Sequence, residues 1–167
     1  MAERDTIVDK QRLTYEGLFD AKELYRLMDD YFEDRNYDKR EIRNIEVVKE
    51  EGKFIDIEIE PWKKYTDYYR NIIHIRIIMT DLKEVEVERH KTKIKVNQGK
   101  LQMVFDGYIE TDYKDKWESK PMFFFIRMIF DKYIYKPFTL SYAGSVKRDI
   151  DTLVTQIKAF LNVYRAY

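Results

Sequence analysis

Apolar and polar residues alternate with a period of two along most of the chain between residues 45 and 111. Ile55, Ile57 and Ile59, for example, are separated by acidic residues. This alternation is typical of antiparallel strands that have one face in a core and the other in water. It predicts a sheet of about six to seven strands, beginning with a strand over residues 7–19.

One hairpin can be registered from its loop. If residues 89–92 form the loop, Val87 lies opposite Ile94 and Glu88 lies opposite Lys93. This register pairs apolar residues on one face of the hairpin and opposite charges on the other. Because one register satisfies both faces, we expect the hairpin to form with this pairing.

Glycines predict three further features of the sheet. Gly52, as the last residue of a three-residue loop, predicts that Val47 pairs with Ile55. Gly99, together with the residue before it, predicts a turn that ends the strand. Gly107 is expected to mark a bulge.

Two segments have the three- and four-residue spacing of apolar residues that is typical of amphipathic helices. The first begins after Asp20, a predicted N-cap with Glu23 in a capping box, and ends near Asn36. The second is the C-terminal helix, over residues 143–165. Its apolar stripe consists of Val146, Ile150, Leu153, Ile157, Phe160 or Leu161, and Tyr164. The predicted fold class is therefore α+β, with a curved antiparallel sheet wrapped on a long C-terminal helix.

An extra apolar helix is predicted in the inserted segment 119–138, before the C-terminal helix. Ser119 as N-cap, Pro121 in the first turn and Pro137 as the terminator favour this helix. Two interpretations remain open. The helix is buried and closes one end of the sheet, or residues 121–138 form an exposed surface that docks a protein partner or a second copy. The interface candidates are Phe123, Phe124, Phe125, Ile129 and Phe130.

The order of these elements resembles that of the helix-grip superfamily, which includes the START, plant-allergen and polyketide-cyclase-like domains. The inserted segment departs from that order, because the family joins its last strand to the final helix by a short connection. The resemblance implies a cavity between the sheet and the C-terminal helix that holds an apolar small molecule or lipid. The residues expected to line this cavity are Ile57, Ile75, Ile77, Val87, Ile94, Met103, Phe105, Ile150, Leu153 and Ile157.

The balance of charges argues against a nucleic-acid partner. Lys and Arg total 31, as do Asp and Glu, so the formal charge is zero and no basic field draws a polyanion. Cysteine is absent and the chain has only two histidines, which excludes disulfides, thiolate sites and imidazole-rich metal clusters. We therefore expect no metal and no cofactor.

Length and sequence pattern predict one domain, residues 1–167, because the chain shows no repeat and no linker. No apolar run reaches the roughly 18 residues of a transmembrane helix, and the N-terminus lacks the apolar stretch of a signal peptide. A cytoplasmic location is the expectation. The charged fraction of 37%, with more Ile than Leu, suits a heat-adapted organism.

No catalytic residue is predicted. The strand pattern places His74 on the water-facing side and His90 in a loop, and it places no carboxylate in the interior, where acid–base catalysis would need one. The leading hypothesis is a noncatalytic module that binds an apolar small molecule or lipid between the sheet and the C-terminal helix. The alternative is a protein-interaction or self-association module that uses segment 121–138. A cyclase-like enzyme is the third hypothesis.

Overall fold

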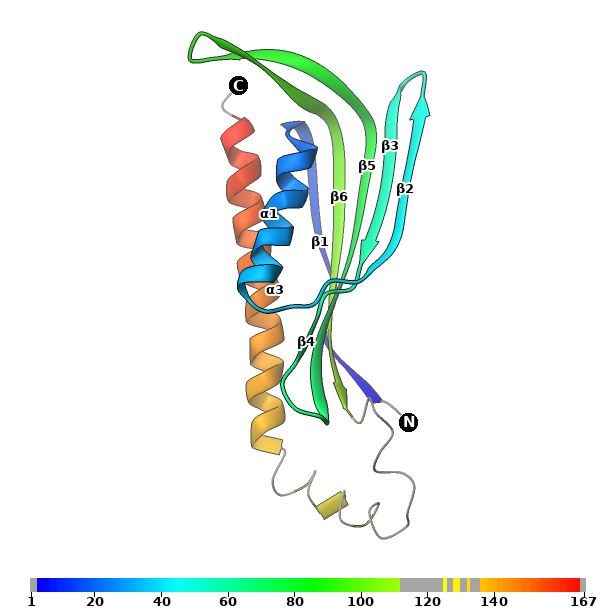
Figure 1. Cartoon of the computed structure of the whole chain (residues 1–167), viewed down its shortest axis with the longest axis vertical. Helices are drawn as coiled ribbons and strands as arrows, with labels where there is room; N and C mark the ends of the chain where they lie inside the picture. Colours follow the sequence, from blue (N-terminus) through cyan, green and yellow to red (C-terminus); the bar gives the residue numbers. More distant parts are fainter. Residues whose placement is uncertain (1–2, 112–124, 126–127, 130–131, 133–135, 166–167) are drawn as a thin grey trace.

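The computed structural model describes residues 3–111, 125, 128, 129, 132 and 136–165. Its described part consists of one antiparallel sheet and two helices on one face of that sheet (Figure 1). The strands are β1 (Glu3–Phe19), β2 (Glu41–Lys49), β3 (Gly52–Ile59), β4 (Trp62–Lys64), β5 (Tyr69–Arg89) and β6 (Thr92–Thr111), and the helices are α1 (Ala21–Asp34) and α3 (Lys136–Tyr164).

The sheet is open and has the strand order β1-β6-β5-β3-β2, with β4 paired to β5 outside this path. Every pairing is antiparallel. The first strand thus lies beside the last one, while β2 forms the opposite edge. The α+β class and the sheet of six strands are confirmed.

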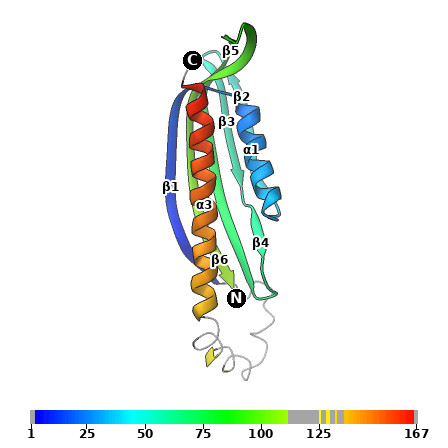
Figure 2. The same cartoon turned by 90° about the vertical axis from the view of Figure 1, so that its left-hand side faces the viewer.

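Helix α3 lies lengthwise against the inner face of the sheet, and α1 lies beside it (Figures 1 and 2). The apolar stripe of α3 faces the sheet, as predicted, because this packing removes its side chains from water. The α3 residues exposed by 4% or less are Val146, Ile150, Leu153, Val154, Ile157 and Leu161. They share one hydrophobic core with the inner face of the sheet and with Leu24, Met28, Tyr31 and Phe32 of α1.

Helix α1 begins and ends where the sequence predicts. Asp20 Oδ1 accepts hydrogen bonds from the backbone N–H groups of Lys22 and Glu23, at 2.9 and 3.1 Å. The helix ends at Asp34, and Asn36 takes a left-handed backbone with φ 57°. Asparagine tolerates this conformation better than most residues, which explains why it stops the helix.

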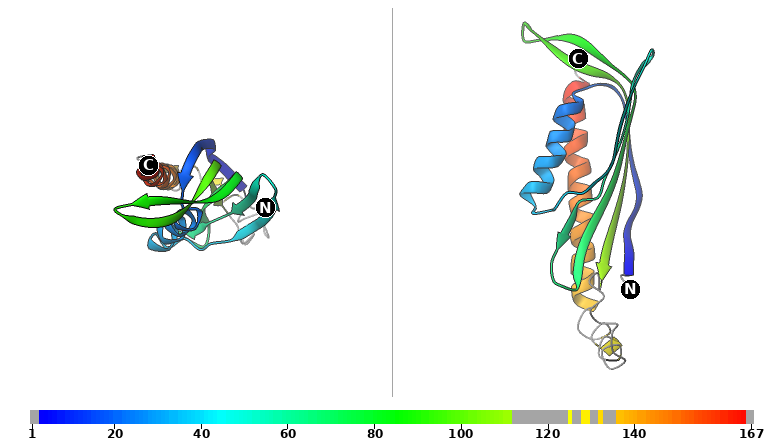
Figure 3. Two further views of the ribbon diagram at one scale, coloured as in Figure 1. Left: turned by 90° about the horizontal axis from the view of Figure 1, so that it is seen from above. Right: turned by 45° about the vertical axis from the view of Figure 1, so that its right-hand side comes forward.

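Strands β5 and β6 form one long hairpin with the predicted register. Val87 pairs with Ile94 and Glu88 with Lys93. Residues 84–96 of this hairpin, which we call the arm, lie beyond the last pairs with β1 and β3 and bend toward the helices (Figures 1 and 3). A register shift between Thr80 and Lys83 lies just before the arm.

The prediction of a turn at Gly99 is wrong, because β6 runs through this residue without interruption to Thr111. The predicted bulge does occur at Gly107, but its extra residues lie in β1, where the register shifts on both sides of the Val8–Gly107 pair. Pro137 does not end a helix but is the second residue of α3, a position in the first turn that proline also favours.

The β2–β3 hairpin is displaced by one residue from its predicted register. Its loop has two residues, so Val47 pairs with Phe54 and Ile45 with Asp56. A shift of one residue turns every side chain to the other face of the strand. Ile45 and Val47 therefore lie on the outer face of the sheet, where they are 45% and 41% exposed.

Most of the inserted segment 119–138 lies outside the described residues, including Phe123, Phe124 and Phe130. Phe125, Met128 and Ile129 are described and have a helical backbone. The C-terminal helix begins at Lys136, seven residues before its predicted start.

Candidate functional site

Seven of the ten residues predicted to line a cavity lie together in the core. They are Ile75 and Ile77 of β5, Met103 and Phe105 of β6, and Ile150, Leu153 and Ile157 of α3, each exposed by 1% or less. The helix approaches the sheet closely, since a Cβ built on Gly107 of β6 would lie 2.7 Å from Val146 Cγ1 and 2.8 Å from Ile150 Cδ1. At this point α3 and the sheet are in direct contact.

Of the other three residues, two lie outside this core. Val87 and Ile94 are half-buried partners on the arm, beyond the sheet. Ile57 of β3 belongs to the same core, at 8% exposure, and also lines a groove at the end of the sheet from which the arm extends.

This groove is the candidate site, and we call it the Ile55 groove. It has a volume of about 670 Å³ and lies between the N-terminus of α1 and the inner face of strands β2, β3, β5 and β6. Its apolar wall consists of Ala21, Tyr25, Ile55, Ile57, Met79, Leu82 and Val96. Its polar rim consists of Asp20, Lys22, Asn44, Glu46, Lys53, Glu84, Lys95 and Asn97.

Two ion pairs cross the rim. Lys53 Nζ lies 2.8 Å from Glu46 Oε1, and Lys95 Nζ lies 3.1 Å from Glu84 Oε1. In each pair the hydrogen bond to the carboxylate raises the pKa of the lysine. These side chains are at least half exposed, so the pairs contribute little to stability and are easily opened by a competing polar group.

The N-terminus of α1 closes the groove on its other side. The backbone N–H of Ala21 donates to Asn97 Oδ1 at 3.1 Å, and the next two N–H groups donate to Asp20. These donors of the first turn are therefore already occupied by protein groups. Since the rim also carries three acidic and three basic side chains, the groove offers no excess of either charge.

A second polar cluster lies inside the molecule, between the sheet and α3. Asn71 Nδ2 donates to Ser145 Oγ at 3.2 Å and to the Tyr65 hydroxyl at 3.4 Å, and the two hydroxyls lie 2.9 Å apart. Asn71 is fully buried, and its Oδ1 has no partner among the described residues. The predicted strand pattern did not include this cluster. Asn71 nevertheless alternates in step with Ile73, Ile75 and Ile77, so its side chain occupies an inward position of the strand.

Tyr37 and Asp149 extend this polar region toward α1. The Tyr37 hydroxyl donates to Asp149 Oδ2 at 2.7 Å, and Tyr31 donates to the backbone oxygen of Asp149 at 2.6 Å. Burial raises the pKa of Tyr31 to about 12 and, together with the bond to Asp149, raises that of Tyr37 well above its ordinary value. Both phenols therefore stay protonated near neutral pH and act as hydrogen-bond donors, not as bases.

The outer face of the sheet carries the acidic residues that alternate with Ile55, Ile57 and Ile59. Asp56 accepts hydrogen bonds from Arg76 at 3.1 and 3.2 Å and from Arg43 at 3.4 Å. The bond to Arg76 lowers the pKa of Asp56, against the opposing effect of burial. His74 lies on this face, as predicted, with Nε2 at 2.7 Å from Glu58 Oε1.

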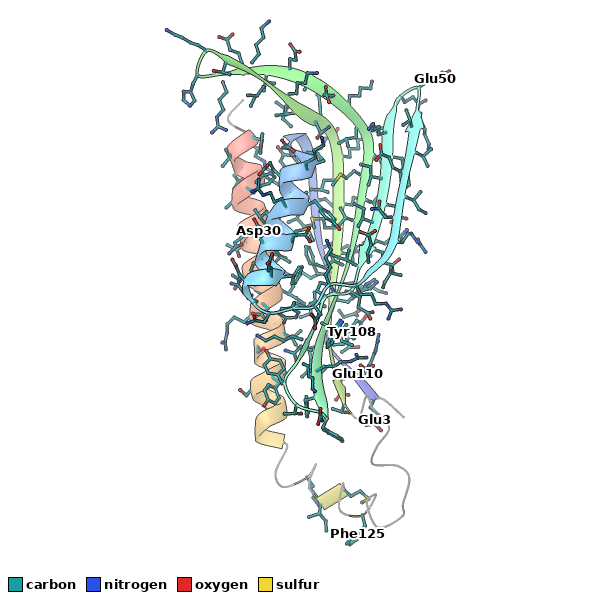
Figure 4. The ribbon with its side chains drawn as sticks, viewed as in Figure 1. Glu3, Asp30, Glu50, Tyr108, Glu110 and Phe125 are labelled. Atoms are coloured by element: carbon teal, nitrogen blue, oxygen red, sulfur yellow. The ribbon has the colours of Figure 1, made fainter. Side chains whose placement is uncertain are left out.

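A third group on the outer face lies near the lower end of the sheet. Glu110 is 4% exposed and is held by Arg4 and Arg70 (Figure 4). Asp56 and Glu110, the two buried carboxylates of the outer face, are thus each paired with two arginines. Among the described residues, no group of three or more His, Asp or Glu side chains is arranged to hold a metal ion.

None of the helices in the described parts of the chain is long and apolar enough to cross a membrane. Comparison of the chain with protein-family models, with curated proteins and with solved structures finds no match.

Proposed function

We propose that this chain is a noncatalytic binding module of helix-grip type, which holds a small molecule or lipid with an apolar body in the Ile55 groove. The observation that carries this proposal is the groove itself, with its apolar wall and polar rim on the inner face of the sheet. Binding sites for small molecules are typically concave and mostly apolar, with a few polar groups that orient the ligand. The helix-grip assignment draws support from the position of β1 beside the last strand and of α3 across the inner face.

We place the ligand in the groove and not beneath α3, because α3 contacts the sheet directly at Gly107. The apolar body would lie against Ile55, Ile57 and Met79, and the polar end would meet the rim. Since the rim's charges balance, a neutral or zwitterionic ligand fits best. Binding without chemistry agrees with the buried phenols of Tyr31 and Tyr37, which are donors near neutral pH.

Nile red, a neutral apolar dye, provides the test, together with mass spectrometry of an organic extract of the purified protein. Ile55→Trp fills the groove and is expected to weaken dye binding about tenfold, the effect of losing roughly 1.4 kcal/mol. Ile78→Trp is the matched control, because Ile78 is a half-buried residue on the outer face of β5, opposite Asp56. The proposal fails if Ile55→Trp binds the dye as tightly as the control does.

The second candidate function is docking of a partner protein, or of a second copy, through the apolar segment 121–138. It is favoured by the exposure of Phe125, Met128 and Ile129, at 64%, 58% and 46%. Figure 4 shows Phe125 away from the sheet and the two helices. Large apolar side chains that gather at a surface are typical of interaction sites. Light scattering of the wild type and of a Phe125→Asp, Ile129→Asp variant tests it, with Leu140→Asp, at a 73% exposed position, as the control. Association that is the same in all three proteins excludes this function.

A further inference from the structure

In the described part of the chain, strand β2 forms a free edge of the sheet that is rich in apolar residues. It is the last strand in the sheet order, and among the described strands it pairs only with β3 (Figure 1). All nine of its residues are exposed. Ile42, Ile45, Val47 and Val48 are exposed by 41–73%. A free edge presents backbone N–H and C=O groups that another strand can pair with.

The hairpin loop determines which backbone groups face the free edge. A two-residue loop makes Lys49 and Gly52 the closing hydrogen-bonded pair of the hairpin. Hydrogen-bonded and non-hydrogen-bonded pairs then alternate along the ladder. The N–H and C=O groups of Ile45 and Val47 therefore point to β3, and those of Asn44, Glu46 and Val48 point outward.

We infer that a second copy of this chain pairs with β2 through its own β2, antiparallel, around a twofold axis at Ile45. In this register Ile45 of one copy lies opposite Ile45 of the other, as a non-hydrogen-bonded pair. Asn44 of each copy lies opposite Glu46 of the other, and both belong to the outward-pointing set that can form the hydrogen bonds. The strand is thus complementary to itself in its backbone groups and in its side chains.

Charge selects this register over its neighbour. An axis at Glu46 would place Glu46 opposite itself and Arg43 opposite Lys49, and like charges directly opposite each other are unfavourable. An axis at Ile45 opposes no like charges. It adds an amide donor, Asn44, to each Glu46 carboxylate, which Lys53 already contacts at 2.8 Å. The regular part of β2 that pairs in this way is residues 43–47, because a register shift lies between Glu41 and Arg43.

Because so few residues pair, the contact buries little surface and the dimer is transient. A disulfide that traps the dimer covalently is therefore the appropriate assay. The chain has no cysteine, so one introduced thiol is a specific reporter. In Ile45→Cys the two Cα atoms of the pair are about 4.5 Å apart, which permits a disulfide. In Val48→Cys the two thiols lie about six residues apart along the strands, or roughly 20 Å, although Val48 is more exposed.

Disulfide formation is measured by nonreducing electrophoresis under mild oxidation, with circular dichroism to confirm that each variant is folded. Ile45→Cys is expected to cross-link at least about tenfold faster than Val48→Cys, because pairing raises the effective concentration of its thiols. Equal rates would indicate random collision and would overturn the inference. Faster cross-linking of Val48→Cys would also overturn it.

Substitutions at Asn44 test the register independently. In the Ile45→Cys background, Asn44→Lys introduces two ion pairs with Glu46 of the other copy, and Asn44→Asp introduces two repulsive pairs. The first is expected to raise the cross-linking rate and the second to lower it, and added salt should reduce both effects. If the two variants cross-link at the same rate, Asn44 does not face Glu46 and the proposed register is wrong. Leu140→Asp, at a 73% exposed position of α3, serves as a control that should leave the rate unchanged.

Discussion

Replacement of Gly107 by alanine tests how closely α3 is seated on the sheet, and so where a ligand has room. The added Cβ would lie 2.7 Å from Val146 Cγ1 and 2.8 Å from Ile150 Cδ1, whereas ordinary contact begins at 3.4 Å. Val146 and Ile150 are fully buried, so neither side chain can move into solvent. The helix must shift, or its side chains must leave their preferred rotamers.

The expected cost follows from two opposing effects. Overpacking of a core costs about 1–3 kcal/mol, whereas replacing glycine by alanine restricts the unfolded chain and returns about 0.4–1 kcal/mol. The free energy of unfolding should therefore fall by about 1–2 kcal/mol, which lowers the melting temperature by about 2–8 °C for a domain of this size.

Chemical denaturation of three variants measures this effect. Gly144→Ala is the matched control, because Gly144 lies in α3 and a Cβ there has no heavy atom within 4 Å. The substitution should stabilise the helix by roughly 0.5–1 kcal/mol. Ile150→Val alone should cost about 0.5–1.5 kcal/mol and should cost less in the Gly107→Ala background, because it removes the clashing Cδ1. If Gly107→Ala stabilises the protein as the control does, α3 is not seated on β6, and the ligand would belong beneath the helix.

Four further substitutions probe the polar groups and the arm. Tyr37→Phe removes a hydrogen bond to the Asp149 carboxylate and should lower the free energy of unfolding by about 1.5–3 kcal/mol. Tyr31→Phe removes a hydrogen bond to a backbone oxygen and should lower it by only about 0.5–1.5 kcal/mol. Urea denaturation that ranks the two variants in the opposite order would contradict this assignment. Because the pKa of Asp56 is lowered in the folded state from its ordinary 3.8, the stability it contributes is present above that value and is lost as the pH falls through the lowered pKa. Asp56→Asn should thus be less stable than the wild type at pH 7, by about 1–3 kcal/mol. The free energies of unfolding of the two proteins, measured by urea denaturation, should become equal once the pH lies below the lowered pKa of Asp56. A difference that persists at this low pH would show that the charge of Asp56 is not the source of the stability. Lys91 has a left-handed backbone with φ 65°. Lys91→Gly should relieve roughly 1 kcal/mol of strain and raise the melting temperature by about 2–4 °C. An unchanged melting temperature in thermal denaturation would show that the turn is unstrained.

The β5–β6 register was predictable because both faces of that hairpin constrain it. The apolar side chains of Val87 and Ile94 pack together on one face of the hairpin. The opposite charges of Glu88 and Lys93 pair on the other face in the same register. A shift by one residue would break both sets at once. Sequence patterns specify a register well where two independent requirements agree.

The β2–β3 register was not predictable, because the role of Gly52 is only partly local. Its φ of 142° favours glycine, and a Cβ on this residue would also lie 2.7 Å from the backbone carbon of Asp81 in β5. Glycine is thus required both by its backbone conformation and by the close approach of a strand that is distant in sequence. A pattern of residues around a loop does not contain this information.

The candidate groove also depends on contacts between distant segments, since α1, β2, β3, β5 and β6 all contribute to it. The strand pattern placed Ile57 on the correct face, but it did not indicate that α1 leaves this end of the face uncovered. The buried cluster around Asn71 was within reach of the sequence. An asparagine at an inward position of a strand otherwise filled by isoleucine is a polar group that must find partners.

Strand β2 connects the two proposals, because Asn44 and Glu46 belong both to the rim of the groove and to the edge that faces a second copy. The Glu46 carboxylate bonds Lys53 in the free protein. A ligand whose polar end engages Lys53 would release part of that carboxylate for Asn44 of the other copy. Binding would then favour pairing, and by linkage pairing would favour binding to the same extent. The Ile45→Cys variant should therefore cross-link faster with bound Nile red, and a rate that the dye leaves unchanged would show that the groove and the edge act independently.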